Sequence, residues 1–137
     1  WAILNNEKYT GVSFHYMDSG IDTGRIILQK EITIKEEDTA YSLYHKLIGV
    51  FSSNFCEAFD LLMAGYNGME QKGLSSYYSR KLPYEGKREI KDLNLEDAWR
   101  FVRAMYFPPY KGAVFILKDG SRVEVNSIES LHQYMEV

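Results

Sequence analysis

The strongest constraint on the fold is a strand–loop–strand pattern over residues 10–29. Apolar side chains alternate along the first strand at Val12, Phe14 and Tyr16. This period of two predicts a strand with one apolar face, and the opposite face can present His15. A second extended segment over residues 25–34 repeats the alternation. We therefore expect two neighbouring strands joined by a short, exposed loop.

The loop between these strands carries two carboxylates and two glycines, Asp18, Asp22, Gly20 and Gly24. We expect it to bend at the glycines, where positive φ is available at little steric cost. A carboxylate on a short loop between sheet strands is well placed to face a cleft, because the scaffold is rigid and the loop is exposed.

A metal site is an alternative use of these carboxylates. The spacing from Asp18 to Asp22 lacks the ligand pattern of a calcium loop, and Gln29 stands where the closing Glu would be. The lone Cys56 excludes an internal disulfide and a cysteine zinc cage. The sequence therefore predicts no metal.

Further along, apolar residues at steps of three and four predict a long helix over residues 40–64. Asp38 or Thr39 is a suitable N-cap, and Gly65 is a suitable stop. The Phe and Leu side chains of this helix are expected to be core residues. Residues 67–91 show weak periodicity and are interpreted as a connector rich in Tyr and basic residues.

The last third of the chain combines a helix and a hairpin. A capping arrangement begins at Asn94, an amphipathic helix continues to Met105, and the prolines at 108–109 end it. Residues 113–117 and 122–125 predict a β-hairpin whose type I′ turn is formed by Asp119 and Gly120.

Composition places the chain among globular domains. Of its 137 residues, 45% are apolar and 26% are charged, and the net charge is −3, which does not favour nucleic acid as a partner of the whole protein. No apolar run approaches the roughly 18 residues of a membrane span, and we expect a cytoplasmic location without membrane partners. The apolar opening at Trp1, without a Met, suggests the C-terminal portion of a longer protein.

Five short motifs carry a family resemblance. They are Trp1-Ala-Ile, Thr10-Gly-Val, His15, Asp18-Ser-Gly-Ile-Asp22-Thr-Gly24 and Ile26-Ile-Leu-Gln29. In order and spacing they resemble the second half of the formyltransferase domain that uses 10-formyltetrahydrofolate. That family includes methionyl-tRNA formyltransferase, glycinamide ribonucleotide formyltransferase and the sugar-amine N-formyltransferases.

The resemblance implies an α/β fold. Residues 1–72 would form the C-terminal half of a Rossmann-like formyltransferase domain, a mixed sheet covered by helices. Residues 73–92 would connect it to a C-terminal extension, residues 93–137, made of a helix and a small β-hairpin appendage.

The resemblance also implies residue roles. Asp22 would be the catalytic aspartate and His15 would help to hold it. Five loop residues, Met17, Asp18, Ser19, Gly20 and Ile21, would line the folate pocket with their backbone. The family's Asn and His that polarise the formyl oxygen match nothing in this chain, so we expect residues 1–137 alone to be inactive.

The acceptor amine is the least constrained part of the prediction. About 25 residues follow Gly112, too few for the β-barrel that binds tRNA, so a nucleotide-linked amino sugar is favoured over methionyl-tRNA. Contacts to it could come from Tyr77, Tyr78, Arg103 or Tyr110. A homodimer is a further partner to consider, and a non-catalytic binding or interaction domain is the alternative from another class.

Overall fold

The computed structural model describes residues 1–135 and forms two compact units. The loop unit comprises residues 9–33 and 44–77, and the core unit comprises residues 1–8, 34–43 and the chain from 78 onward. The predicted domain boundaries at residues 72 and 92 stay a prediction. Among the described residues, no helix combines the length and apolar character that crossing a membrane requires.

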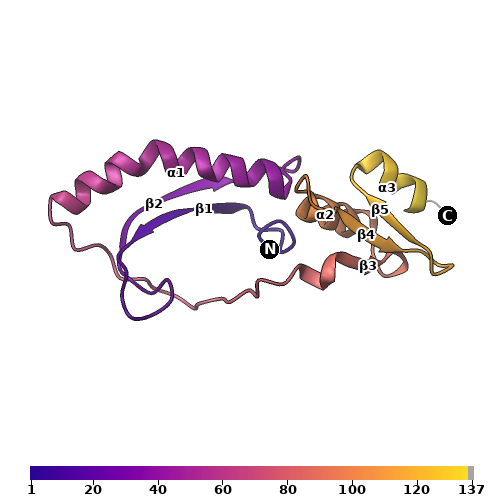
Figure 1. Cartoon of the computed structure of the whole chain (residues 1–137), viewed down its shortest axis with the longest axis horizontal. Coiled ribbons are helices and arrows are strands. Elements are labelled where there is room, and N and C mark those ends of the chain that lie inside the picture. The colour runs from indigo at the N-terminus through magenta and orange to yellow at the C-terminus, as the bar shows by residue number, and fades with distance from the viewer. Residues whose placement is uncertain (136–137) are drawn as a thin grey trace. The chain divides into compact units, whose positions relative to one another are not determined.

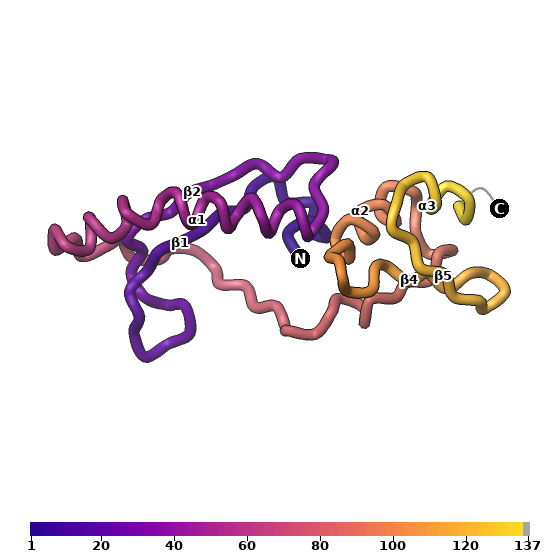
Figure 2. Tube along the Cα trace, turned by 45° about the horizontal axis from the view of Figure 1, so that its top comes forward, coloured from indigo at the N-terminus to yellow at the C-terminus, as the bar shows by residue number. Residues whose placement is uncertain are grey.

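The loop unit is built on two antiparallel strands, β1 (Tyr9–His15) and β2 (Ile26–Thr33), as the alternation predicted. Phe14 lies opposite Leu28, and a register irregularity after Phe14 places His15 opposite Ile26. The helix α1 (Ala40–Met63) runs beside both strands in Figures 1 and 2. Phe14 stacks on Phe51 of this helix, with ring centroids 5.0 Å apart.

Both predicted ends of α1 are confirmed. The Ser42 backbone N–H donates to the Thr39 side-chain oxygen at 3.1 Å, as an N-cap requires. At the other end Gly65 has φ of +75°, and its N–H donates to the Leu62 carbonyl while Tyr66 N–H donates to the Leu61 carbonyl. This pair of bonds is a Schellman motif, which glycine completes without a Cβ clash.

The prediction that the aromatic side chains of α1 form a core is wrong for this chain. Phe51, Phe55 and Phe59 are 44%, 51% and 47% exposed. The helix is apolar over more than one face, and two strands cover only part of that surface. Ala58, on the covered face, is buried.

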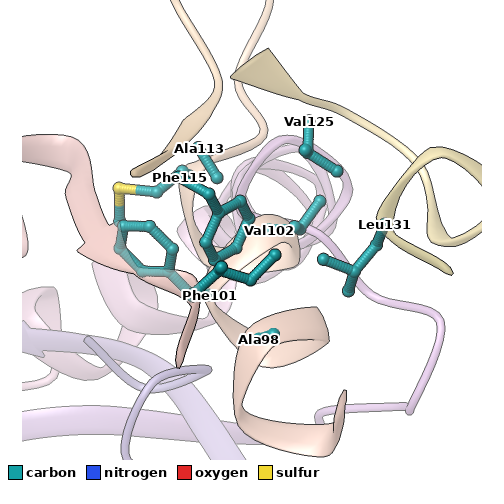
Figure 3. Packing of buried hydrophobic residues seen from close by; sticks show 9 residues of the cluster. Ala98, Phe101, Val102, Ala113, Phe115, Val125 and Leu131 are labelled. Atoms are coloured by element: carbon teal, nitrogen blue, oxygen red, sulfur yellow. The ribbon is translucent and has the colours of Figure 1, made fainter. Parts of the chain in front are cut away.

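The core unit has its own closed interior. The strands β3 (Lys87–Glu89) and β4 (Ala113–Ile116) pair in parallel, and β5 (Arg122–Val125) pairs with β4 in antiparallel orientation. The helix α2 (Leu95–Met105) begins at the predicted cap, where Asn94 accepts from Asp97 N–H at 2.8 Å. Figure 3 shows the buried cluster between these elements, formed by Ala98, Phe101, Val102, Ala113, Phe115, Val125 and Leu131.

Three details of the core unit differ from the predictions or go beyond them. The hairpin turn is not type I′, because Gly120 has positive φ but Asp119 does not. Gly120 N–H and Leu117 N–H donate to the carbonyls of Leu117 and Ser121, so three residues rather than two form the loop. The predicted connector contains β3, between short 3-10 turns at Pro83–Gly86 and Ile90–Asp92. The tail forms α3 (Ile128–Met135).

Candidate active site

The loop joining β1 to β2 extends beyond the ends of the two strands and turns back, as Figure 2 shows. Tyr16 N–H donates to the Arg25 carbonyl at 2.9 Å and closes its base. A Cβ on Gly24 would lie 1.7 Å from the Tyr16 carbonyl oxygen, so this position requires glycine for space. The expectation of positive φ at Gly20 and Gly24 is wrong. Asp22 takes the left-handed conformation instead, with φ of +54°, which aspartate tolerates better than most residues.

Asp18 shapes the loop from inside. Its Oδ1 accepts from Thr23 Oγ1 at 2.6 Å and from Gly20 N–H at 2.9 Å. The Thr23 hydroxyl, and after it the Gly20 N–H, holds the pKa of Asp18 below its usual value, because both stabilise the carboxylate. Asp18 and Asp22 therefore have different surroundings although they lie on one loop.

Asp22 and His15 form a pair of side chains that could take part in proton transfer. His15 Nε2 lies 3.5 Å from Asp22 Oδ1, and the two side chains are 25% and 86% exposed. His15 Nδ1 lies 2.8 Å from the Tyr16 carbonyl oxygen, which can only accept. Nδ1 must therefore carry a proton, so in the neutral ring Nε2 is the acceptor. The charged ring would donate from Nε2 to the Asp22 carboxylate.

A hollow of about 390 Å³ opens beside this pair, lined by Ser13, His15, Asp22, Ile26, Gln29 and Gln71. Gln29 Nε2 donates to Ser13 Oγ at 2.9 Å across the two strands. Gln71 Nε2 donates to the carbonyls of Asp22 and Gly24, each at 2.7 Å. Sequence reasoning missed Gln71, since it lies in an aperiodic segment 49 residues after Asp22. Its place next to the loop is set by tertiary contacts.

The other predicted folate-side residues occupy the same loop. Met17 and Ile21 are 94% and 88% exposed, and Ser19 and Gly20 are exposed as well. The role of these loop residues in folate binding stays a prediction. The further prediction that neither Asp18 nor Asp22 holds a metal stays a prediction.

The predicted acceptor contacts are divided between the units. Tyr77 belongs to the loop unit and is 87% exposed. In the core unit, Tyr110 is 75% exposed, whereas Tyr78 stacks on Trp1 with ring centroids 4.9 Å apart. Arg103 is buried, and its Nη1 donates to the Asp38 carbonyl at 3.0 Å. This contact gives Arg103 a structural role; its role toward substrate stays a prediction.

Two curated relatives match nearly the whole chain. The GDP-perosamine N-formyltransferase of Brucella melitensis biotype 1 is 40% identical over 98% of this chain and 51% of its own length. The methionyl-tRNA formyltransferase of Thermodesulfovibrio yellowstonii is 36% identical over 96% of this chain and 42% of its own length. The chain thus spans about half the length of the curated relatives it matches.

Solved structures agree with the sequence matches. A 4-N formyltransferase from Francisella tularensis shares the fold with a TM-score of 0.77, at 24% identity, over 92% of this chain and 53% of that one. An N-formyltransferase from Helicobacter canadensis, in complex with folinic acid and dTDP-3-aminofucose, gives 0.66 at 30% identity, over 82% and 42%. These neighbours confirm the predicted Rossmann-like α/β class.

The family described as formyl transferase matches residues 1–58, which include β1, the loop with Asp18 and Asp22, and β2. The motif match, the 40% identity to a sugar N-formyltransferase and the shared fold agree with one another. The chain is therefore similar to the formyl transferase family over residues 1–58 and spans about half the length of the relatives it matches.

Proposed function

We propose that the full-length protein transfers a formyl group from 10-formyltetrahydrofolate to a primary amine, the amino group of a nucleotide-linked amino sugar. The observation that carries the proposal is the pair of His15, at the end of β1, and Asp22, on the following loop, which lie 3.5 Å apart within the family match. The folate donor is supported by the Helicobacter canadensis relative, which was solved with folinic acid.

The donor supplies an activated formyl carbon, and this chain's residues would handle the proton that the attacking amine must lose. Asp22 presents an exposed carboxylate that can accept a hydrogen bond from the amine. His15, fixed by the Tyr16 carbonyl, faces that carboxylate with Nε2 and can hold a proton there. The exposed loop residues Met17 and Ile21 would lie against the pterin ring.

The favoured acceptor rests on the relatives. The Brucella melitensis protein is named for GDP-perosamine and has the higher identity, whereas the Thermodesulfovibrio yellowstonii protein is named for methionyl-tRNA. The latter match keeps methionyl-tRNA as the second candidate. A cytoplasmic location and a homodimer stay predictions.

The test is an assay of the full-length protein with formyl-folate against a panel of nucleotide-linked amino sugars and charged initiator tRNA. We expect turnover with at least one amino sugar and none with the tRNA. Turnover with the tRNA alone would replace the acceptor, and no transfer to any amine would favour the non-catalytic alternative. Residues 1–137 assayed alone should be inactive, because the family's formyl-polarising Asn and His match no residue among them.

A further inference from the structure

Gln71 holds the loop of the candidate site with a single amide group. Its Nε2 carries two N–H donors, and these reach the carbonyls of Asp22 and Gly24, each at 2.7 Å. The two carbonyls flank Thr23, so the glutamine spans the part of the loop where Asp22 takes the left-handed conformation. One side chain from a distant segment therefore binds two backbone carbonyls beside the candidate carboxylate.

The segment that carries Gln71 is itself fastened to β2. Met69 and Ile26 exchange two backbone hydrogen bonds of 2.8 Å, which form an isolated antiparallel β-bridge. Arg25 Nε donates to the Gly68 carbonyl at 3.1 Å. Gln71 lies two residues after this bridge, so the backbone that carries its side chain is held close to β2.

The Asp22 side chain has little positioning of its own. It is 86% exposed, and its carboxylate meets His15 Nε2 at the long distance of 3.5 Å. The internal bonds of Asp18 stabilise residues 18–23 among themselves but do not tie Asp22 to the strands. Since a displacement of about 1 Å at a catalytic group can lower a rate about 100-fold, the direction of the carboxylate depends on its backbone anchor.

We infer that Gln71 is a positioning residue that sets Asp22 against the reacting amine by clamping the carbonyls of Asp22 and Gly24. This inference rests on the proposed function for its kinetic consequence. The clamp itself is independent of that function, because it concerns the order of residues 17–25.

The experiment compares the full-length wild-type protein with Gln71→Ala, Gln71→Glu and Gln133→Glu. Gln133 is an exposed glutamine on α3 and serves as the matched control for the change in charge. Steady-state kinetics with formyl-folate and the preferred amine give kcat and KM, and hydrogen exchange of the peptide covering residues 17–25 reports on the loop.

We expect Gln71→Ala to lower kcat about 10- to 100-fold while both KM values stay within about threefold, because the carboxylate is misdirected rather than lost. Its loop peptide should exchange faster. In Gln71→Glu, the two carbonyl oxygens should raise the pKa of the new carboxyl, and its protonated form regains a hydrogen-bond donor. The ratio of its kcat to that of wild type should therefore rise as the pH falls from 8 to 5.5. The ratio for Gln71→Ala should stay flat, and Gln133→Glu should match wild type.

The outcomes separate the two claims. An active wild type with an undiminished kcat in Gln71→Ala overturns the positioning role alone. A uniform fall in activity that follows the loss of folded protein, with no difference in pH dependence between Gln71→Glu and Gln71→Ala, also overturns it. If wild type transfers no formyl group, the proposed function fails, and unchanged hydrogen exchange in Gln71→Ala would then refute the clamp as well.

Discussion

The two units bury their apolar side chains to different extents. In the core unit a cluster closes between α2, α3 and the three strands, and Phe101 and Phe115 at its centre are 1% and 0% exposed. In the loop unit the described buried hydrophobic residues are Ile27 and Ala58, and aromatic side chains of α1 remain about half exposed. Contiguous exposed apolar surface of this kind is typical of interaction sites.

The candidate chemistry and the closed core therefore belong to different units of this chain. The loop unit carries His15, Asp22 and Gln71 on a scaffold that is covered on one side. The aromatic face of α1 is exposed in this chain, which spans about half the length of the relatives it matches. Substitutions in the two units should therefore affect different measurements.

Asp22→Asn should have the largest effect on activity. We expect turnover of the full-length protein to fall by about 10³-fold or more, because amide nitrogen and oxygen cannot take up the amine proton. Folate binding should stay within a few-fold, and stability within about 0.5 kcal/mol, since the side chain is 86% exposed and Asn also tolerates positive φ.

The matched control for this charge change is Asp119→Asn, on the hairpin turn of the core unit, which should leave turnover unchanged. Substantial residual activity in Asp22→Asn would show that another group handles the proton.

Phe101→Ala should have the largest effect on stability. The ring is 1% exposed and packs edge-on against Phe115 at 5.7 Å, so its removal should lower the free energy of unfolding by about 3–5 kcal/mol. Denaturant unfolding of residues 1–137 measures this change. A loss below about 1 kcal/mol would mean that the core unit is not the closed interior described above.

Phe55→Ala is the corresponding test in the loop unit. In residues 1–137 we expect a loss of only about 1 kcal/mol, because half of the ring is already in water. In the full-length protein the loss should approach that of a buried phenylalanine, about 3 kcal/mol or more, if the rest of the chain covers this face. Equal small losses of unfolding free energy in residues 1–137 and in the full-length protein would show that the aromatic face stays exposed.

Thr23→Val should have the smallest effect. It removes the hydroxyl that contributes most to lowering the pKa of Asp18, so the pKa should move toward the ordinary value near 3.9, followed by NMR titration. Because a lowered folded pKa stabilises the fold above the unfolded value, this contribution is lost as the pH falls through the folded pKa. The variant should therefore be less sensitive to acid, and an unchanged pKa would contradict the assigned bond.

Local patterns in the sequence were sufficient for several elements. The alternation around Phe14 predicted β1 and its two faces, and the cap at Asn94 predicted the start of α2. Gly65 predicted the end of α1, since only glycine enters that conformation cheaply. The motifs over residues 1–29 indicated the family, which the matches confirm. In each case the determining interactions lie within a few residues of one another.

Tertiary structure decided the rest, because the contacts concerned join distant segments. Residues 87–89 pair with β4 as a strand, and the helix of the tail places Leu131 in the buried cluster with residues of α2. Gly24 is required by the approach of Tyr16, and the positive φ falls on Asp22 instead. Gln71 reaches the loop across 49 positions, through a bridge at Met69. Local sequence patterns indicated the carboxylate that the candidate site presents, whereas the contacts that hold it in place form only in the folded chain.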